Sequence, residues 1–146
     1  MKGNFINTLK IEFPAKSVNE GFARAAVAAF AAQTDPGIGA LADLKTAVSE
    51  AVTNAIVHAY RDDPERKYKP VYIFCRLTDG NRITVKIRDK GRGIADVKMA
   101  MQPLYTTDAA GERSGMGFTV MQSFCDRVKV NSKPGKGTTV TLEKSL

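Results

Sequence analysis

The segment Ile83-Thr84-Val85-Lys86-Ile87-Arg88-Asp89-Lys90-Gly91-Arg92-Gly93 joins an alternating apolar run to a glycine signature. The alternation predicts a half-buried strand, and Asp89 has the same odd parity as the apolar residues. Its carboxylate should therefore point to the buried face, where an acid needs a hydrogen-bond donor. An amino purine can supply that donor. An Asp-Gly turn, in which the carboxylate bonds its own backbone, fits the same residues equally well.

A second glycine signature, Ser114-Gly115-Met116-Gly117-Phe118, opens a predicted helix. Free N–H groups and the dipole at a helix start favour phosphate. Arg113 could add a bidentate phosphate contact, although a surface loop arginine is the simpler interpretation. In the first signature, Gly91 and Gly93 would let the backbone approach a purine ring with no Cβ between them. The two signatures together predict a nucleotide pocket without a P-loop, whose glycine and Ser/Thr pattern is missing.

A polar stripe follows one edge of a predicted helix. Glu50, Asn54 and His58 fall within roughly 80° of one another at about 100° per residue. A carboxylate and a carboxamide one turn apart can hold a cation by oxygen and orient a proton acceptor. An ordinary solvated helix edge would show the same residues, so the stripe takes its meaning from the glycine signatures downstream.

Thr138 is the last candidate site residue and lies in a predicted strand. It shares parity with Val140 and Leu142, so its hydroxyl should face inward. There it could assist Asp89 at a base, or it could serve only as a good strand former.

Periodicity predicts the first half of the fold. Alternation over residues 9–13 predicts a strand that Pro14 ends. Ser17 and Glu20 have the spacing of a capping box, which predicts a helix to about Gln33. The expected apolar face of this helix comprises Val18, Phe22, Ala25, Ala26 and Ala29. A second helix, about 41–60, should bury Leu41, Leu44, Ala47, Val48, Ala51, Val52, Ala55, Ile56 and Ala59.

The second half adds strands around a long irregular segment. Residues 71–77 and 83–87 predict an antiparallel hairpin across Asp79-Gly80-Asn81. A nucleotide lid at about 95–114, with a short helix near 96–101, precedes a helix from about residue 115 and two closing strands. The order predicts an α/β two-layer sandwich, with a mixed, mostly antiparallel sheet and helices on one face.

Composition narrows the function classes. The 146 residues, 43% of them hydrophobic, suit a single domain, 1–146. No apolar run approaches membrane-spanning length and no signal segment follows Met1, so we expect a cytoplasmic protein. Cys75 and Cys125 lie in apolar segments and should be buried free thiols. With one histidine, a zinc site lacks ligands, and any metal must be held by oxygen.

The net charge of +7 comes from scattered residues without long like-charge runs. It fits a solvated basic surface, or a positive field that attracts ATP or an acidic protein. We expect no direct nucleic-acid binding, because aromatic and basic residues are not interleaved on any predicted face.

The motifs resemble, in order, the four boxes of the ATPase superfamily shared by gyrase B, Hsp90, histidine kinases and MutL. They are Glu50-Ala-Val-Thr-Asn54-Ala-Ile-Val-His58, Asp89-x-Gly91-x-Gly93, Ser114-Gly115-Met116-Gly117 and Gly137-Thr138-Thr139. Within that superfamily, longer runs resemble the sporulation anti-sigma F factors. These runs are Ser49-Glu50-Ala51-Val52-Thr53-Asn54-Ala55-Ile56, Gln102-Pro103-Leu104-Tyr105-Thr106-Thr107 and Glu112-Arg113-Ser114-Gly115-Met116-Gly117-Phe118-Thr119-Val120-Met121.

The resemblance implies a Bergerat-type ATP-binding fold and a protein-serine kinase that uses ATP and Mg2+ and releases ADP. Such proteins bind a sigma factor of the sigma F type, phosphorylate an anti-anti-sigma factor and act as homodimers. It implies that Asn54 is a magnesium ligand, that Glu50 is the catalytic base, and that Asp89 and Thr138 contact adenine. The other implied nucleotide contacts are Gly91, Gly93, Thr106, Thr107, Arg113, Ser114, Gly115, Met116 and Gly117.

Two further positions carry expectations from the resemblance. Arg24 matches a position at the partner-binding surface, where a solvated helix arginine is the alternative. Asp108 stands where relatives often have lysine, so a lid contact to the γ-phosphate is not expected from it.

Two other functions remain open. One is a detached catalytic module of a histidine kinase, whose acceptor would come from another chain because the one histidine, His58, lies in the first of the four boxes and no separate acceptor helix pair is present. The other is a binding module that uses ATP only to fix a clamp on a partner.

Overall fold

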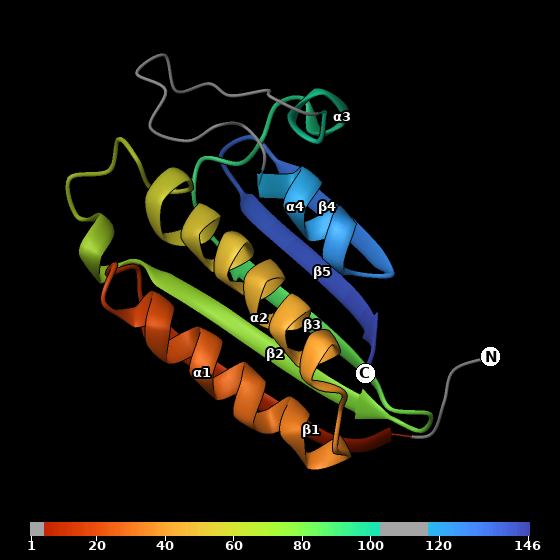
Figure 1. Cartoon of the computed structure of the whole chain (residues 1–146). Helices are drawn as coiled ribbons and strands as arrows, with labels where there is room; N and C mark the ends of the chain where they lie inside the picture. Colours follow the sequence, from red (N-terminus) through yellow and green to blue (C-terminus); the bar gives the residue numbers. More distant parts are fainter. Residues whose placement is uncertain (1–4, 103–116) are drawn as a thin grey trace.

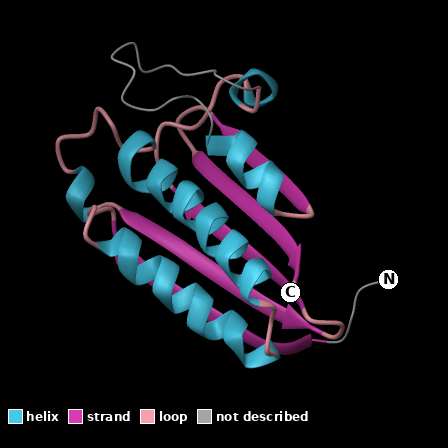
Figure 2. Cartoon of the chain, in the orientation of Figure 1, coloured by secondary structure: helices cyan, strands magenta, loops and turns pink. Residues whose placement is uncertain are grey.

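The computed structural model describes residues 5–102 and 117–146 as a five-stranded sheet with helices packed on one face (Figure 1). The elements follow one another along the chain as β1 (Phe5–Pro14), α1 (Asn19–Ala31), η1 (Ala32–Thr34), α2 (Ile38–Thr53), η2 (Asn54–His58), η3 (Arg66–Tyr68), β2 (Pro70–Thr78), β3 (Arg82–Asp89), α3 (Val97–Ala100), α4 (Gly117–Phe124), β4 (Arg127–Lys133) and β5 (Gly137–Ser145). The predicted two-layer α/β architecture is confirmed (Figure 2). None of the helices within the described ranges is both long and apolar enough to cross a membrane.

The sheet has the strand order β1-β2-β3-β5-β4, and every neighbouring pair is antiparallel. The expected mixed character is therefore absent among the described strands. The two helices α1 and α2 connect β1 to β2. The first leads away from the end of β1 and the second leads back to it, so β2 begins beside the end of β1 and runs antiparallel to it. β3 and β4 run in the same direction but are not neighbours. β5 forms a hairpin with β4 and lies between it and β3, so both contacts of β5 are antiparallel.

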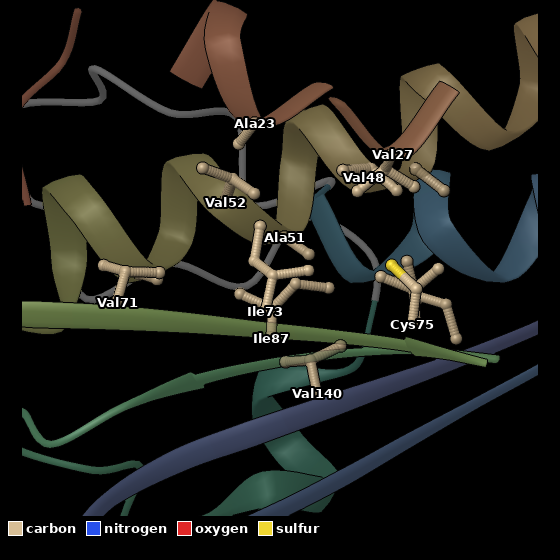
Figure 3. Close-up of a cluster of buried hydrophobic side chains, with 14 of the residues drawn as sticks. Ala23, Val27, Val48, Ala51, Val52, Val71, Ile73, Cys75, Ile87 and Val140 are labelled. Carbon is tan, nitrogen blue, oxygen red and sulfur yellow. The ribbon is translucent and has the colours of Figure 1, made fainter. Parts of the chain in front are cut away.

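The core lies between the sheet and α2, which crosses the middle of the helical layer (Figure 3). Leu44, Val48, Val52, Ile56 and Tyr60 recur every four residues and are all buried, as an amphipathic helix requires. The side chains of the strands that point toward α2 complete the core; they are odd-numbered in β2 and β3 and even-numbered in β5. These are chiefly Val71, Ile73, Leu77, Ile83, Val85, Ile87, Val140 and Leu142.

Both cysteines are buried and free, as predicted. Burial raises the pKa of Cys75 to about 12. Burial also raises the pKa of Cys125 to about 11, although the charge of Lys144 opposes the effect. Both groups therefore remain neutral thiols near neutral pH.

The predicted apolar face of α1 is wrong. Val18 is 78% exposed and Phe22 is 57% exposed, whereas Ala23, Val27 and Phe30 are buried. At about 100° per residue the predicted and the buried faces lie on nearly opposite sides of the helix. Because alanine occurs all around α1, the hydrophobic pattern does not distinguish one side from the other.

The predicted capping box at Ser17 is also absent. The α1 N-cap residue is Val18, which makes no side-chain capping bond, and Glu20 N donates to the Ser17 carbonyl at 3.2 Å. Glu20 instead accepts a hydrogen bond from Ser49 Oγ at 3.0 Å and lies 3.5 Å from the Arg24 guanidinium. Its carboxylate thus links α1 to α2, which competes with capping.

The two phenylalanines of α1 test which face is buried. We expect Phe30→Ala to lower the free energy of unfolding by about 3 to 5 kcal/mol, because a large buried side chain leaves a cavity. Phe22→Ala, on the same helix, should change it by less than about 1 kcal/mol. Urea unfolding followed by circular dichroism measures both. Equal losses in the two variants would contradict the described packing of α1.

Candidate functional site

Asp89 ends β3 with its side chain in the protein interior, as strand parity predicts, and only 6% of it is exposed. Its Oδ1 accepts hydrogen bonds from the backbone N–H groups of Gly91 at 2.9 Å and Thr138 at 3.2 Å. Burial raises the pKa of Asp89 from 3.8 to about 6, although these two N–H groups act to lower it. Neither bond uses Oδ2, so this oxygen can accept from a ligand.

Thr138 lies beside Asp89 because the two residues are paired in the β3–β5 register. Its Oγ1 is 2.8 Å from Ser132 Oγ, which also accepts from Ile94 N at 2.7 Å and lies 3.1 Å from the Gly137 carbonyl. When Ser132 gives its one proton to that carbonyl, Thr138 must donate to Ser132. The Thr138 oxygen then has only acceptor capacity left, like Asp89. A ligand at this end of the site must bring hydrogen-bond donors.

The two glycines of the first signature are required by the packing of the protein itself. A Cβ on Gly91 would lie 2.2 Å from the Ala59 carbonyl oxygen, and one on Gly93 would lie 2.1 Å from that of Lys133. Gly93 also has a φ of +74°, which side chains disfavour. The signature therefore packs a loop tightly between the end of η2 and the β4–β5 turn.

Tyr60 also fixes the loop that contains Gly91 and Gly93. Its hydroxyl accepts a hydrogen bond from Lys90 N at 2.7 Å and donates one to the Pro70 carbonyl at 2.7 Å. Burial raises the pKa of Tyr60, so the hydroxyl keeps its proton near neutral pH. Tyr60 thus ties the residue after Asp89 to the start of β2.

Glu50 and Asn54 meet the beginning of α4. A Cβ on Gly117 would lie 3.4 Å from Glu50 Oε2, 3.5 Å from Asn54 Nδ2 and 3.6 Å from Asn54 Oδ1. The carboxylate and the carboxamide thus converge on Gly117, which is both the last glycine of the second glycine signature and the first residue of α4. Both side chains are only half-buried, so a ligand can reach them.

A π-turn interrupts the helix at this point. Residues Asn54–His58 form η2, and Ala59 N donates to the Asn54 carbonyl at 3.0 Å. Such turns are rare and often occur at functional sites. The regular 100° spacing used to place His58 on the stripe therefore ends at Thr53, and His58 is not among the three nearest neighbours of the Gly117 Cβ position.

The donor set at Glu50 and Asn54 fits some metals and not others. No group of three or more His, Cys, Asp or Glu side chains that could hold a metal occurs in residues 5–102 and 117–146. Mg2+ usually takes only one or two protein oxygens together with water and phosphate oxygens. Asn54 Oδ1, with Glu50 Oε2 close by, meets that requirement, whereas a zinc site would need more side chains.

Arg24 lies on α1. Its guanidinium pairs with Glu20 at 3.5 Å, and its side chain is 40% exposed. It is thus placed at the surface, near the seam between α1 and α2.

Several predicted contacts lie outside the described residues. They are Thr106, Thr107, Arg113, Ser114, Gly115 and Met116, together with Asp108 and most of the predicted lid. Among the described residues the structure brings together Glu50, Asn54 and Gly117 at one point and Asp89, Gly91, Gly93 and Thr138 at another.

Sequence reasoning missed Tyr60 and Ser132. Tyr60 continues the four-residue repeat of Val52 and Ile56, which marked it as buried and therefore in need of a partner for its hydroxyl. Ser132 continues the inward parity of Val130 in β4, which could have placed it opposite Thr138.

Comparison with known proteins agrees with this geometry. A model of the histidine kinase-like ATPase domain matches residues 13–144. An anti-sigma F factor of Caldanaerobacter subterraneus subsp. tengcongensis is 55% identical over 140 residues, which are 96% of this chain and 94% of that protein. An anti-sigma F factor of Bacillus subtilis is 51% identical over 140 residues, with 96% and 93% covered.

Solved structures with little sequence similarity share the fold. The RsbU and RsbW domains of a Mycobacterium tuberculosis protein align with a TM-score of 0.70 at 19% identity, covering 97% of this chain and 33% of that chain. The SiaB–SiaC complex of Pseudomonas aeruginosa gives a TM-score of 0.61 at 10% identity, covering 97% and 91%.

The raised pKa of Asp89 makes stability depend on pH. The folded state binds this proton more tightly than the unfolded state, so the stabilisation exists below pH 3.8 and is lost as the pH rises to about 6. Across this window we expect the free energy of unfolding of the wild type to fall relative to that of Asp89→Asn, by at most about 3 kcal/mol. Urea titrations of both proteins measure the difference. A constant difference would contradict the burial of this carboxylate.

Proposed function

The chain belongs to the anti-sigma F factor family of histidine kinase-like ATPase domains, and from this membership we propose that it is an ATP-dependent protein-serine kinase that also binds a sigma factor. Its phosphorylation substrate is an anti-anti-sigma factor, and it acts as a homodimer. The observation that carries the kinase proposal is the convergence of Glu50 Oε2 and the Asn54 carboxamide at Gly117.

The two ends of the site are spaced for an extended nucleotide. Gly91 touches Ala59, which follows Glu50 by nine positions along α2 and η2, or about 13 Å along the axis. A nucleoside triphosphate can bridge such a separation, whereas free phosphate or a nucleoside is too short. The acceptors of Asp89 and Thr138 suit the exocyclic amine of adenine, which offers two N–H donors.

At the other end the side chains suit phosphoryl transfer. Asn54 holds Mg2+, which neutralises phosphate charge, while N–H groups at the start of α4 face the phosphates. Glu50 accepts the proton of the substrate serine as the serine oxygen bonds the γ-phosphorus and the bond to the leaving ADP oxygen breaks. Catalysis of this kind depends mainly on positioning and charge neutralisation. Thr106, Thr107, Arg113, Ser114, Gly115 and Met116 complete the proposed nucleotide contacts.

The proposed sigma-binding surface includes Arg24 and the first turns of α1. Val18 and Phe22 there are large apolar side chains exposed to solvent. Arginine is one of the residue types that are enriched among the side chains that dominate binding energy at protein interfaces.

Replacing Glu50 separates catalysis from binding. We expect Glu50→Gln to slow phosphate transfer from γ-labelled ATP to the anti-anti-sigma partner by about 100-fold or more, because the base is lost. ATP affinity should change little, since the side chain keeps its size. Glu65→Gln, in the exposed loop before η3, is the matched control and should transfer phosphate at the wild-type rate.

The same assay distinguishes the alternative functions. Label that survives acid on the partner indicates phosphoserine, whereas acid-labile label would favour a histidine kinase module. Label found only as free phosphate would overturn the kinase proposal. A Glu50→Gln variant with the wild-type transfer rate would refute the role of Glu50 as base.

Replacing Arg24 tests the partner surface. We expect Arg24→Ala to weaken binding to the sigma factor by about tenfold or more, while ATP affinity is unchanged. The loss of its pair with Glu20 should cost little stability, because exposed ion pairs contribute little. Surface plasmon resonance measures the affinity, with Arg66→Ala in η3 as the control. Unchanged sigma binding in Arg24→Ala would place the interface elsewhere.

A further inference from the structure

The face of the sheet that the helices leave open carries aromatic rings surrounded by basic side chains. Tyr72 and Phe74 project from it as alternate residues of β2, one strand in from the edge. The Phe74 ring lies 5.8 Å from Lys10 Nζ and 5.7 Å from Arg76 Cζ. The Tyr72 ring lies 5.8 Å from Arg88 Cζ and 5.4 Å from Lys90 Nζ. These distances are near the limit of about 6 Å for a cation–π contact, so the cations flank the rings loosely.

The expectation that no face interleaves aromatic and basic residues is therefore wrong. The pattern joins side chains from β1, β2 and β3 and becomes visible only once the strand register is known. Lys10 is paired with Phe74, and Phe74 with Lys86, while Tyr72 is paired with Arg88.

The composition of this face is dominated by cationic and threonine side chains. Its outward strand positions comprise Thr8, Lys10, Glu12, Tyr72, Phe74, Arg76, Thr78, Arg82, Thr84, Lys86, Arg88, Arg127, Lys129, Asn131, Thr139, Thr141 and Glu143. Apolar aliphatic residues border this face at the two ends of β1, where Pro14 is paired with Pro70 and Ile6 is exposed at the irregular start of the strand. Protein interfaces are enriched in tyrosine, phenylalanine and arginine but depleted of lysine, so Lys10, Lys86 and Lys129 are the residues of this face that favour nucleic acid over a protein partner.

The charges on this face are strongly unbalanced. Glu143 is already paired with Arg127 at 4.0 Å, and Arg82 with Asp126 at 3.8 Å. Within the part of the chain that the structure describes, Lys86 and Lys129 make no ion pair. Threonine hydroxyls between the cations can donate to phosphate or sugar oxygens. A flat cationic face therefore surrounds two rings that are about 7 Å apart along one strand.

We propose that the open face of the sheet binds single-stranded nucleic acid, with bases stacked on Tyr72 and Phe74 and the phosphates held by the surrounding lysines and arginines. Aromatic rings on a sheet and a positive surface are the two components of sequence-tolerant single-strand binding. A duplex would engage the cations but could not stack its bases on the rings. An acidic protein segment would likewise use only the charges.

The structure offers matched controls for both components. Tyr68 in η3 is an exposed aromatic residue beside Lys67, whose Nζ lies 5.3 Å from the ring centroid, so it copies the pairing away from the sheet face. Tyr68→Ala controls for loss of a ring, and Lys67→Gln controls for loss of one charge.

Fluorescence anisotropy with labelled oligouridylate and oligodeoxythymidylate of about 12 nucleotides tests the proposal on the full chain. We expect Phe74→Ala and Tyr72→Ala each to weaken binding about tenfold, and Tyr68→Ala to leave it unchanged. Lys86→Gln should reduce the slope of log affinity against log salt by about one between about 50 and 200 mM, in contrast to Lys67→Gln. Because Lys86 is exposed, its variant keeps the test valid if a ring variant fails to fold.

Two competitors complete the experiment. A single strand should displace the labelled oligonucleotide better than a duplex of the same length or polyglutamate. Equal displacement by duplex would mean that the face binds phosphates without stacking bases. Equal displacement by polyglutamate would indicate an acidic protein partner. Either result, or wild-type affinity in both Phe74→Ala and Lys86→Gln, overturns the proposal.

Discussion

The position of Asp89 relative to Glu50 and Asn54 depends on one backbone contact, between Ala59 and the loop of Gly91 and Arg92. Arg92 N donates to the Ala59 carbonyl at 2.9 Å, and a Cβ on Gly91 would overlap that carbonyl. The last carbonyl groups of a helix lack partners within the helix. The glycine loop supplies one, so the end of the helix that carries Glu50 and Asn54 is fixed to the end of the strand that carries Asp89.

Two side chains reinforce this contact from either side. Tyr60 bonds Lys90 N and the Pro70 carbonyl, which ties the loop to the start of β2. Ser132 bonds Ile94 N and lies within hydrogen-bond distance of Thr138 and the Gly137 carbonyl. Because the loop is held at both ends, the acceptors at Asp89 and Thr138 keep their positions without a bound ligand. Preorganisation of this kind reduces the ordering cost of binding.

Much of the fold and half of the site could be predicted from local patterns. Strand alternation gave the inward direction of Asp89 and Thr138, because the period of two leaves no other choice. The buried face of α2 followed from large aliphatic residues at helical spacing. The buried face of α1 could not be predicted, because alanine residues occur on every side of this helix. The packing requirement for glycine at Gly91 and Gly93 could not be predicted, since it comes from the backbone of Ala59 and Lys133, which only the tertiary structure brings close.

The same alternation separates two chemistries that share the strands. Asp89 faces the helices, whereas Arg88, its neighbour in the chain, faces the open side beside Tyr72. Thr138 and Thr139 in β5 divide in the same way between the buried network and the open face. A change in the charge of the open face therefore need not disturb the hydrogen bonds at Asp89, because the sheet itself lies between them. Residues adjacent in sequence can thus vary independently here, whereas Gly91 is constrained by Ala59, which is distant in sequence.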